Sequence, residues 1–124
     1  MLGSAKLVAF APITDPKRAR KFYGGVLELR FVSQDPFALV MDANGTMLRL
    51  AVVQSFTPQP FTILGWEVSS IEKTVAALKK KGVRFERFPG MQQDSLGIWT
   101  APSGARVAWF KDPEGNVLSV SEFA

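Results

Sequence analysis

The strongest constraint on the fold is that the chain repeats itself at low similarity. The stretch "LVMDANGTMLRLAV" (39–52) and the stretch "WFKDPEGNVLSV" (109–120) each predict two short strands joined by an acidic turn. Adding 70 to the number of Asp42 or Arg49 gives Asp112 or Ser119 in the second copy, and adding 55 takes Val8 to Ile63. The chain is therefore predicted to be an internal duplication.

Each copy also contains one predicted helix. Asp15-Pro16 is an acidic cap followed by a proline in the first turn of the first helix. Ser70 precedes apolar residues at helical spacing, which predict a second helix that ends at Gly82. Strands are predicted at 6–14, 29–34, 61–69 and 83–88, and residues 90–104 are an insertion in the second copy. The fold class is thus α+β, with two tandem βαβββ modules at about 5–54 and 61–124 and a linker at 54–60.

Composition narrows the class of protein. A chain of 124 residues is one domain with an adequate core, and it contains no cysteine for disulfides or thiolate chemistry. No apolar run approaches the roughly 18 residues that span a bilayer, and no secretory signal is visible, so we expect a cytoplasmic protein. The net charge of +4 comes from basic runs on the helices, which we interpret as solvated faces and not as a nucleic-acid site.

Alternation along the strands divides the side chains into two faces. One set is wholly apolar and is predicted to pack under the helices: Leu7, Ala9, Ala11, Ile13, Leu39, Met41, Leu48, Leu50 and Val52, then Leu64, Trp66, Val68, Val107, Trp109, Leu118 and Val120. The opposite set mixes small, aromatic and charged residues, which suits a ligand cavity or a seam between sheets.

The motifs "ITDPKRARKFYGGVLEL" and "FKDPEGNVLSV", placed in two βαβββ modules, resemble the vicinal oxygen chelate superfamily, which includes glyoxalases, bleomycin resistance proteins and extradiol dioxygenases. The resemblance covers essentially the whole chain. It implies that the modules form a cupped, mostly antiparallel mixed sheet around a cavity. It also implies metal ligands on the first and last strand of each module, at Val8, Arg49, Ile63 and Ser119 in this chain.

None of these four residues is a histidine or a carboxylate, and the chain has no histidine at all. Two of the side chains are hydrocarbon, one is a permanent cation and one is a neutral hydroxyl, so they do not suit a divalent ion. We therefore expect no metal site and no cofactor.

The residues predicted to bind a ligand lie on the mixed face or in the insertion. Arg49 and Arg106 would orient an anionic or carbonyl-bearing ligand, unless Glu67 pairs with one of them as a structural bridge. Glu67 is the only candidate for acid–base catalysis. The insertion, with Trp99, is either a lid or a hairpin that covers a sheet edge or a dimer contact. The candidate ligand-binding residues are Phe10, Arg49, Glu67, Trp99, Arg106, Phe110 and Ser119.

The function that this reading predicts is metal-free binding of a small molecule that is planar and neutral to anionic. Two alternatives stay open: a metal-independent lyase or isomerase, and a non-catalytic interaction module. The resemblance further implies a homodimer. We expect neither a nucleic acid nor a membrane as a partner.

Overall fold

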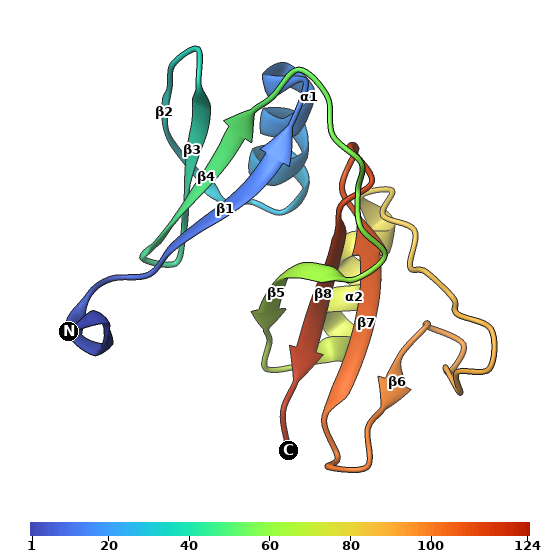
Figure 1. The fold of residues 1–124 in the computed structure, drawn as a ribbon. Helices are drawn as coiled ribbons and strands as arrows, with labels where there is room; N and C mark the ends of the chain where they lie inside the picture. Colours follow the sequence, from blue (N-terminus) through green and yellow to red (C-terminus); the bar gives the residue numbers. More distant parts are fainter. The chain divides into compact units, whose positions relative to one another are not determined.

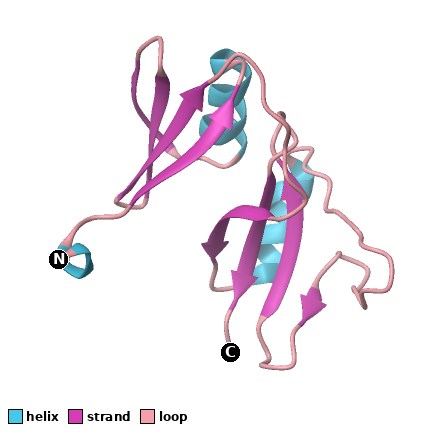
Figure 2. Cartoon of the chain, viewed as in Figure 1, coloured by secondary structure: helices cyan, strands magenta, loops and turns pink.

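The computed structural model describes all 124 residues. The chain divides into two compact units, Met1–Thr57 (unit 1) and Pro58–Ala124 (unit 2), and each is a βαβββ module. Figure 1 shows the elements of both units, and Figure 2 shows how much of unit 2 is loop. The predicted α+β class with two βαβββ modules is confirmed.

Unit 1 is a four-stranded mixed sheet of order β1-β4-β3-β2, in which β1 runs parallel to β4 and the other pairs are antiparallel. A short 3₁₀ turn, η1, precedes the sheet, and a π-helical stretch, η2, continues α1. The bounds are η1 Leu2–Ser4, β1 Val8–Ile13, α1 Pro16–Arg20, η2 Lys21–Val26, β2 Arg30–Gln34, β3 Ala38–Ala43 and β4 Thr46–Val52.

Unit 2 repeats this arrangement with the order β5-β8-β7-β6, and β5 runs parallel to β8. Its edge strand β6 is very short, and α2 contacts β7 and β8. The bounds are β5 Thr62–Glu67, α2 Ile71–Lys80, β6 Trp99–Thr100, β7 Arg106–Lys111 and β8 Val117–Glu122.

Both helices begin where the sequence predicts. The Asp15 carboxylate accepts the Arg18 N–H at 3.1 Å, and Pro16 opens the first turn. The Ser70 hydroxyl accepts the Lys73 N–H at 3.4 Å, and Gly82 follows α2 with a φ of +93°. The change to π-helical hydrogen bonding at Lys21 was not predicted, because the apolar spacing of a single turn does not distinguish the two helix types.

The face predicted to pack under α1 is the core of unit 1. Ile13, Leu39, Met41 and Leu50 are each fully buried there, as is Tyr23 from η2. Leu7 is an exception and is exposed, because it precedes the first paired residue of β1.

In unit 2 the face predicted for β7 is wrong by one residue. Phe110 pairs with Leu118 and Ala108 with Val120, so these residues lie on the helix-covered face, where Phe110 is fully buried. Trp109, predicted to be core, pairs with Ser119 on the opposite face. Arg106, Ala108 and Phe110 were predicted for that opposite face, and Val107 and Trp109 for the core, so all five are corrected.

The reason is the length of the second hairpin loop. In unit 1, Ala43 pairs with Thr46 across the two-residue loop Asn44-Gly45. In unit 2, the Asp112 N–H donates to the Asn116 carbonyl at 3.0 Å, so the loop is residues 113–115 and contains one more residue. A three-residue loop with a left-handed third residue fits Gly115, whose φ is +94°. Since strand side chains alternate, one extra residue exchanges the two faces of β7.

The strand predicted at 83–88 is also wrong. Only Phe85 forms an isolated bridge there, to Phe110, and the Glu86 N–H donates to the Trp109 carbonyl at 2.8 Å. Strand β6 comes instead from within 90–104 and pairs with the start of β7. Two separate segments therefore cover the outer edge of β7. Phe85 lies beside its C-terminal half and β6 lies beside its N-terminal half.

Neither helix combines the length and the apolar character that a bilayer crossing requires.

Replacing a fully buried phenylalanine should be far more costly than replacing an exposed one. We expect Phe110→Ala to lower the free energy of unfolding by about 3–5 kcal/mol, because it removes a core ring and leaves a cavity. Phe37→Ala, at a position that is exposed, should change it by less than about 0.5 kcal/mol. Urea denaturation measures both values, and equal losses would contradict the corrected register of β7.

Candidate functional site

Each sheet has one face covered by its helix and one face turned away from it, which we call the open face. On the open face of unit 1, Arg49 lies between Phe10 on β1 and Val40 on β3, and Val8 lies beside Met47 one row away. Val8 and Phe10 are exposed, whereas Arg49 is half-buried. The sequence placed Phe10 and Arg49 on the same face, and the strand register shows that they are direct neighbours.

The cation of Arg49 acts on a nearby carboxylate in the turn between β2 and β3. Asp35 accepts the N–H groups of Phe37 and Ala38 at 2.8 and 2.9 Å. These two hydrogen bonds, and more weakly the Arg49 guanidinium, hold the pKa of the Asp35 carboxyl below its ordinary value of 3.8. Asp35 therefore fixes the turn that begins β3 and is the acidic neighbour of Arg49.

The open face of unit 2 consists of three rows that run across the sheet. The row nearest the β7–β8 hairpin has Val117 between Thr62 on β5 and Lys111 on β7, and the other two rows carry the candidate residues. In one row Ser119 lies between Gly65 on β5 and Trp109 on β7. In the other, Ser121 lies between Glu67 and Val107, and Trp99 on β6 continues the row. The face therefore has aromatic rings on β6 and β7, Lys111 at the hairpin end of β7, Val117, Ser119 and Ser121 in the middle, and one carboxylate on β5.

The aromatic side is a cluster of Phe88, Trp99 and Trp109, which we call the aromatic cluster. The Trp99 and Trp109 rings have centroids 6.0 Å apart with planes inclined at 38°, and Phe88 meets Trp109 edge-on at 5.5 Å. The Trp109 indole N–H donates to the Thr62 hydroxyl at 3.0 Å, which fixes the orientation of the ring. Both tryptophans are half-buried, so part of each ring surface faces solvent.

The β5 edge of this face is low at Gly65, which has no side chain. A Cβ atom at Gly65 would lie 2.8 Å from the Ser119 hydroxyl oxygen, closer than real Cβ atoms come. The Ser119 side chain occupies that space and is buried. Gly65 and Ser119 are therefore low on this face, while the Trp109 indole extends across β8 and reaches Thr62 on β5.

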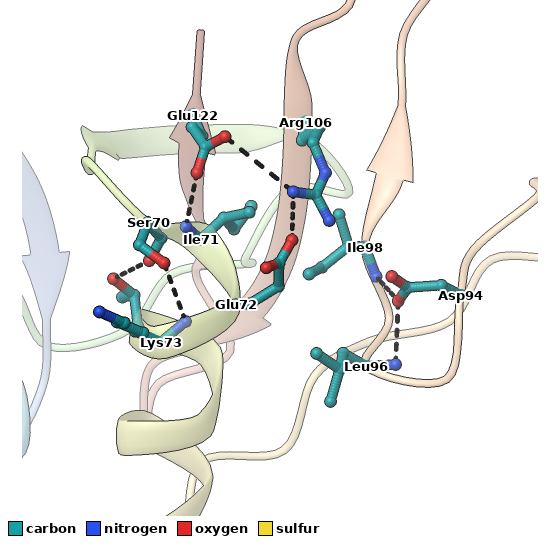
Figure 3. A network of polar contacts seen from close by, with 10 residues as sticks. Ser70, Ile71, Glu72, Lys73, Asp94, Leu96, Ile98, Arg106 and Glu122 are labelled. Carbon is teal, nitrogen blue, oxygen red and sulfur yellow. Dashed lines mark hydrogen bonds and ion pairs between the residues drawn. The ribbon is translucent and has the colours of Figure 1, made fainter.

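Two predicted ligand-binding residues lie on the other face of the unit 2 sheet. Phe110 is in the core, and Arg106 points toward α2, where it pairs with Glu72 and lies 4.0 Å from Glu122 (Figure 3). The Glu122 carboxylate also accepts the Ile71 N–H at 3.0 Å, at the start of α2. Arg106 thus belongs to a network that links the helix to the sheet, and its predicted position on the open face is wrong for the register reason given above.

The four positions that the family resemblance implies for a metal do not fit one. Ser119 and Ile63 lie on β8 and β5 of unit 2, and Val8 and Arg49 lie on β1 and β4 of unit 1. A hydrocarbon side chain donates no electron pair, and a guanidinium repels a cation. The structure also contains no group of three or more His, Cys, Asp or Glu side chains that could hold a metal ion.

Of the predicted residues, unit 2 brings Trp99, Glu67 and Ser119 onto one face, and unit 1 brings Phe10 beside Arg49. Sequence reasoning missed Trp109 and Phe88. The signal for Trp109 was present in "DPEGN", because a proline after Asp112 and a glycine at the third loop position are typical of a three-residue loop. Phe88 carried no such signal, since its contact depends on a segment that is not a strand.

The shifted pKa of Asp35 predicts a specific acid dependence. A carboxyl whose folded pKa is lowered stabilises the fold above its ordinary pKa of 3.8, and that stabilisation is lost as the pH falls through 3.8 toward the folded value. We expect the melting temperature of the wild type to fall more steeply between about pH 5 and about pH 3 than that of Asp35→Asn. Calorimetry across this range measures both, and parallel curves would contradict the assignment.

The carboxylate that caps α2 should matter more than a surface carboxylate. We expect Glu122→Ala to lower the free energy of unfolding by about 1–2 kcal/mol, because the Ile71 N–H loses its acceptor and Arg106 loses a partner. The matched control is Glu86→Ala, whose ion pair with the half-exposed Lys111 spans 3.7 Å and should contribute less than about 1 kcal/mol. Denaturant titration compares the two, and an equal effect would mean that the network does not anchor the helix.

Comparison with known proteins supports the same architecture. The family profile described as Glyoxalase/Bleomycin resistance protein/Dioxygenase superfamily matches residues 7–120, which is nearly the whole chain. No curated protein sequence matches.

Three solved structures illustrate the likeness. A glyoxalase family protein from Enterococcus faecalis has a TM-score of 0.76 at 18% identity, covering 98% of this chain and 100% of that one. A member of the Glyoxalase/bleomycin resistance protein/dioxygenase superfamily from Sphaerobacter thermophilus has a TM-score of 0.69 at 25% identity, with 94% and 96% covered. A genomically encoded fosfomycin resistance protein from Listeria monocytogenes has a TM-score of 0.75 at 10% identity, with 98% and 94% covered.

Proposed function

Because this chain belongs to the Glyoxalase/Bleomycin resistance protein/Dioxygenase superfamily, we propose that it is a small-molecule-binding protein that holds a planar ligand without a metal ion. The ligand lies on the open face of unit 2, against the aromatic cluster and across the small residues beside it. The proposal includes the homodimer expected from the sequence.

The observation that carries the proposal is the pair of tryptophans next to Gly65 and Ser119. The Trp99 and Trp109 ring planes are inclined at 38°, and the positions beside Trp109 in its own row carry only Ser119 and Gly65. Aromatic side chains bind flat rings by stacking and by burying apolar area. Small-molecule sites typically combine such apolar walls with a few polar groups, and Ser119 and Glu67 supply these here.

The charges favour a planar ligand that is uncharged and carries hydrogen-bond donors. The anionic ligand expected from the sequence depended on two arginines, and Arg106 instead pairs with Glu72 toward the helix. Lys111 on the open face of unit 2 is paired with Glu86 at 3.7 Å. Glu67 is exposed on the same face, and its carboxylate can accept an N–H or O–H group and would repel an anion. Arg49 belongs to unit 1 and has Asp35 as an acidic neighbour.

Metal-free binding rests on the donor chemistry of the chain. The residues at the positions where relatives are expected to bind metal offer no imidazole and no carboxylate. The alternative of a metal-independent enzyme rests on Glu67 alone. A Glu67→Gln variant separates the two readings, because it should abolish turnover in an enzyme and should leave most of the affinity of a binder.

The test is a thermal-shift screen of the chelator-treated protein against planar heteroaromatic compounds, with and without Ni²⁺, Zn²⁺, Mn²⁺ or Fe²⁺. A ligand at a hundred times its Kd stabilises the folded state by about 2.7 kcal/mol, which the screen detects readily. We expect stabilisation by a planar compound that is independent of metal. A ligand that binds only with metal present would overturn the metal-free proposal.

The variants then locate the site by calorimetric titration of the ligand found. We expect Trp109→Leu to weaken binding by at least about fivefold, through loss of ring stacking. Gly65→Leu should abolish binding, because its side chain would fill the low strip beside Ser119. The control is Phe123→Leu, at an exposed position of unit 2, which should leave the affinity unchanged. Unchanged affinity in Trp109→Leu and Gly65→Leu would place the ligand elsewhere.

A further inference from the structure

A second feature of the molecule, separate from the open faces, is a groove in unit 1 between the first helix and the edge strand β2. It has a volume of about 510 Å³ and is lined by Lys17, Arg20, Lys21 and Gln34. Three of these four side chains are cationic and the fourth is an amide, so the lining contains hydrogen-bond donors and no carboxylate.

The helix brings the three cations together by its periodicity. Lys17, Arg20 and Lys21 stand at i, i+3 and i+4, which places them on one side of the helix. Like charges at this spacing destabilise a helix, and neither lysine has a carboxylate partner. An oxyanion in the groove would relieve this repulsion.

Arg20 is already held in place for such a role. Its guanidinium lies over the Phe31 ring, with the Cζ atom 3.6 Å from the ring centroid. Stacking occupies one face of the guanidinium and leaves its N–H edge available, and that edge matches two oxygens of a phosphate group. Gln34, at the end of β2, adds an amide on the other side of the groove.

The groove is also larger than a bare oxyanion requires. Its volume of about 510 Å³ lies within the roughly 300–1,000 Å³ that is typical of sites for small organic ligands. An orthophosphate ion would leave most of this space empty. A phosphate group attached to a small organic body would use both the cations and the remaining space.

We therefore propose that this groove binds a small phosphomonoester, with its phosphate group on Lys17, Arg20 and Lys21. This site is independent of the planar ligand proposed for unit 2, and it stands or falls separately. The basic run that contains these residues is then a ligand site in part and not wholly a solvated face.

The experiment titrates the protein with phenyl phosphate, phenol and inorganic phosphate, and follows backbone amides by NMR. We expect phenyl phosphate to shift the amides of Lys17, Lys21 and Gln34, to bind several-fold more tightly than inorganic phosphate, and phenol to have no effect. Inorganic phosphate binding equally well would restrict the site to the bare ion and would overturn the phosphomonoester. Binding of phenol would overturn the role of the cations.

Matched variants separate a defined site from general attraction to a basic protein. The double variant Lys17→Gln with Lys21→Gln should weaken phenyl phosphate binding by about tenfold or more. The double variant Lys79→Gln with Lys80→Gln, on α2, removes the same charge and should change the affinity by less than about twofold. Equal weakening in both would overturn the proposal. Arg20→Lys, which keeps the charge and loses the planar fork, should give an intermediate loss.

A nucleic acid is the other polyanion that a basic surface attracts. The groove offers no exposed aromatic platform, because Arg20 covers Phe31. We expect a short DNA duplex to bind no more tightly to the wild type than to the Lys17→Gln, Lys21→Gln variant at about 150 mM salt. Tight DNA binding that this variant abolishes would overturn the small-molecule assignment.

Discussion

The hydrogen bonds of one carboxylate, Asp112, determine which side chains unit 2 presents on each face of its sheet. Asp112 is buried and accepts the N–H groups of Glu114 and Asn116 at 2.9 Å and the Asn116 side-chain amide at 3.0 Å. These bonds close a loop with one residue more than its counterpart in unit 1, where the Gly45 N–H reaches Asp42 only at 3.4 Å. The extra residue turns Trp109 to the open face and Phe110 into the core, so the proposed ligand site depends on this loop.

The same loop explains how far the sequence could predict the structure. Helix caps and tight turns are set by local sequence signals, and Asp15, Ser70 and the Asn44-Gly45 turn form as predicted. The face of β7 is not local, because it requires the loop length of the hairpin as well as the alternation of the strand. The prediction aligned the two copies by one constant offset across the hairpin loop, although the loop in unit 2 is one residue longer. It therefore assigned the side chains of β7 to the wrong faces.

Residues 83–100, which lie before and within the insertion, show a different limit of prediction from sequence. Alternation in "VRFERF" predicted a strand, yet the edge of β7 is shared between residues near Phe85 and the short strand β6. The loop before β6 is held by side chains that sequence patterns do not reveal. The Gln93 amide donates to the carbonyls of Glu86 and Gly97 at 2.9 Å each, and Asp94 accepts the N–H groups of Leu96 and Ile98. Within the predicted strand, the Phe88 N–H donates to the Gln93 side chain at 2.8 Å and the Glu86 carbonyl accepts from the same side chain, so these two backbone groups bond to a side chain and not to a neighbouring strand.

These contacts also bear on the two roles considered for residues 90–104. Pairing of Trp99 with Val107 covers part of the β7 edge, which would otherwise offer unpaired backbone groups to another chain. The same pairing directs the Trp99 side chain to the open face, where it meets Trp109. One segment therefore protects the edge and contributes an aromatic wall, and a rigid wall loses less conformational entropy on binding than a mobile lid would.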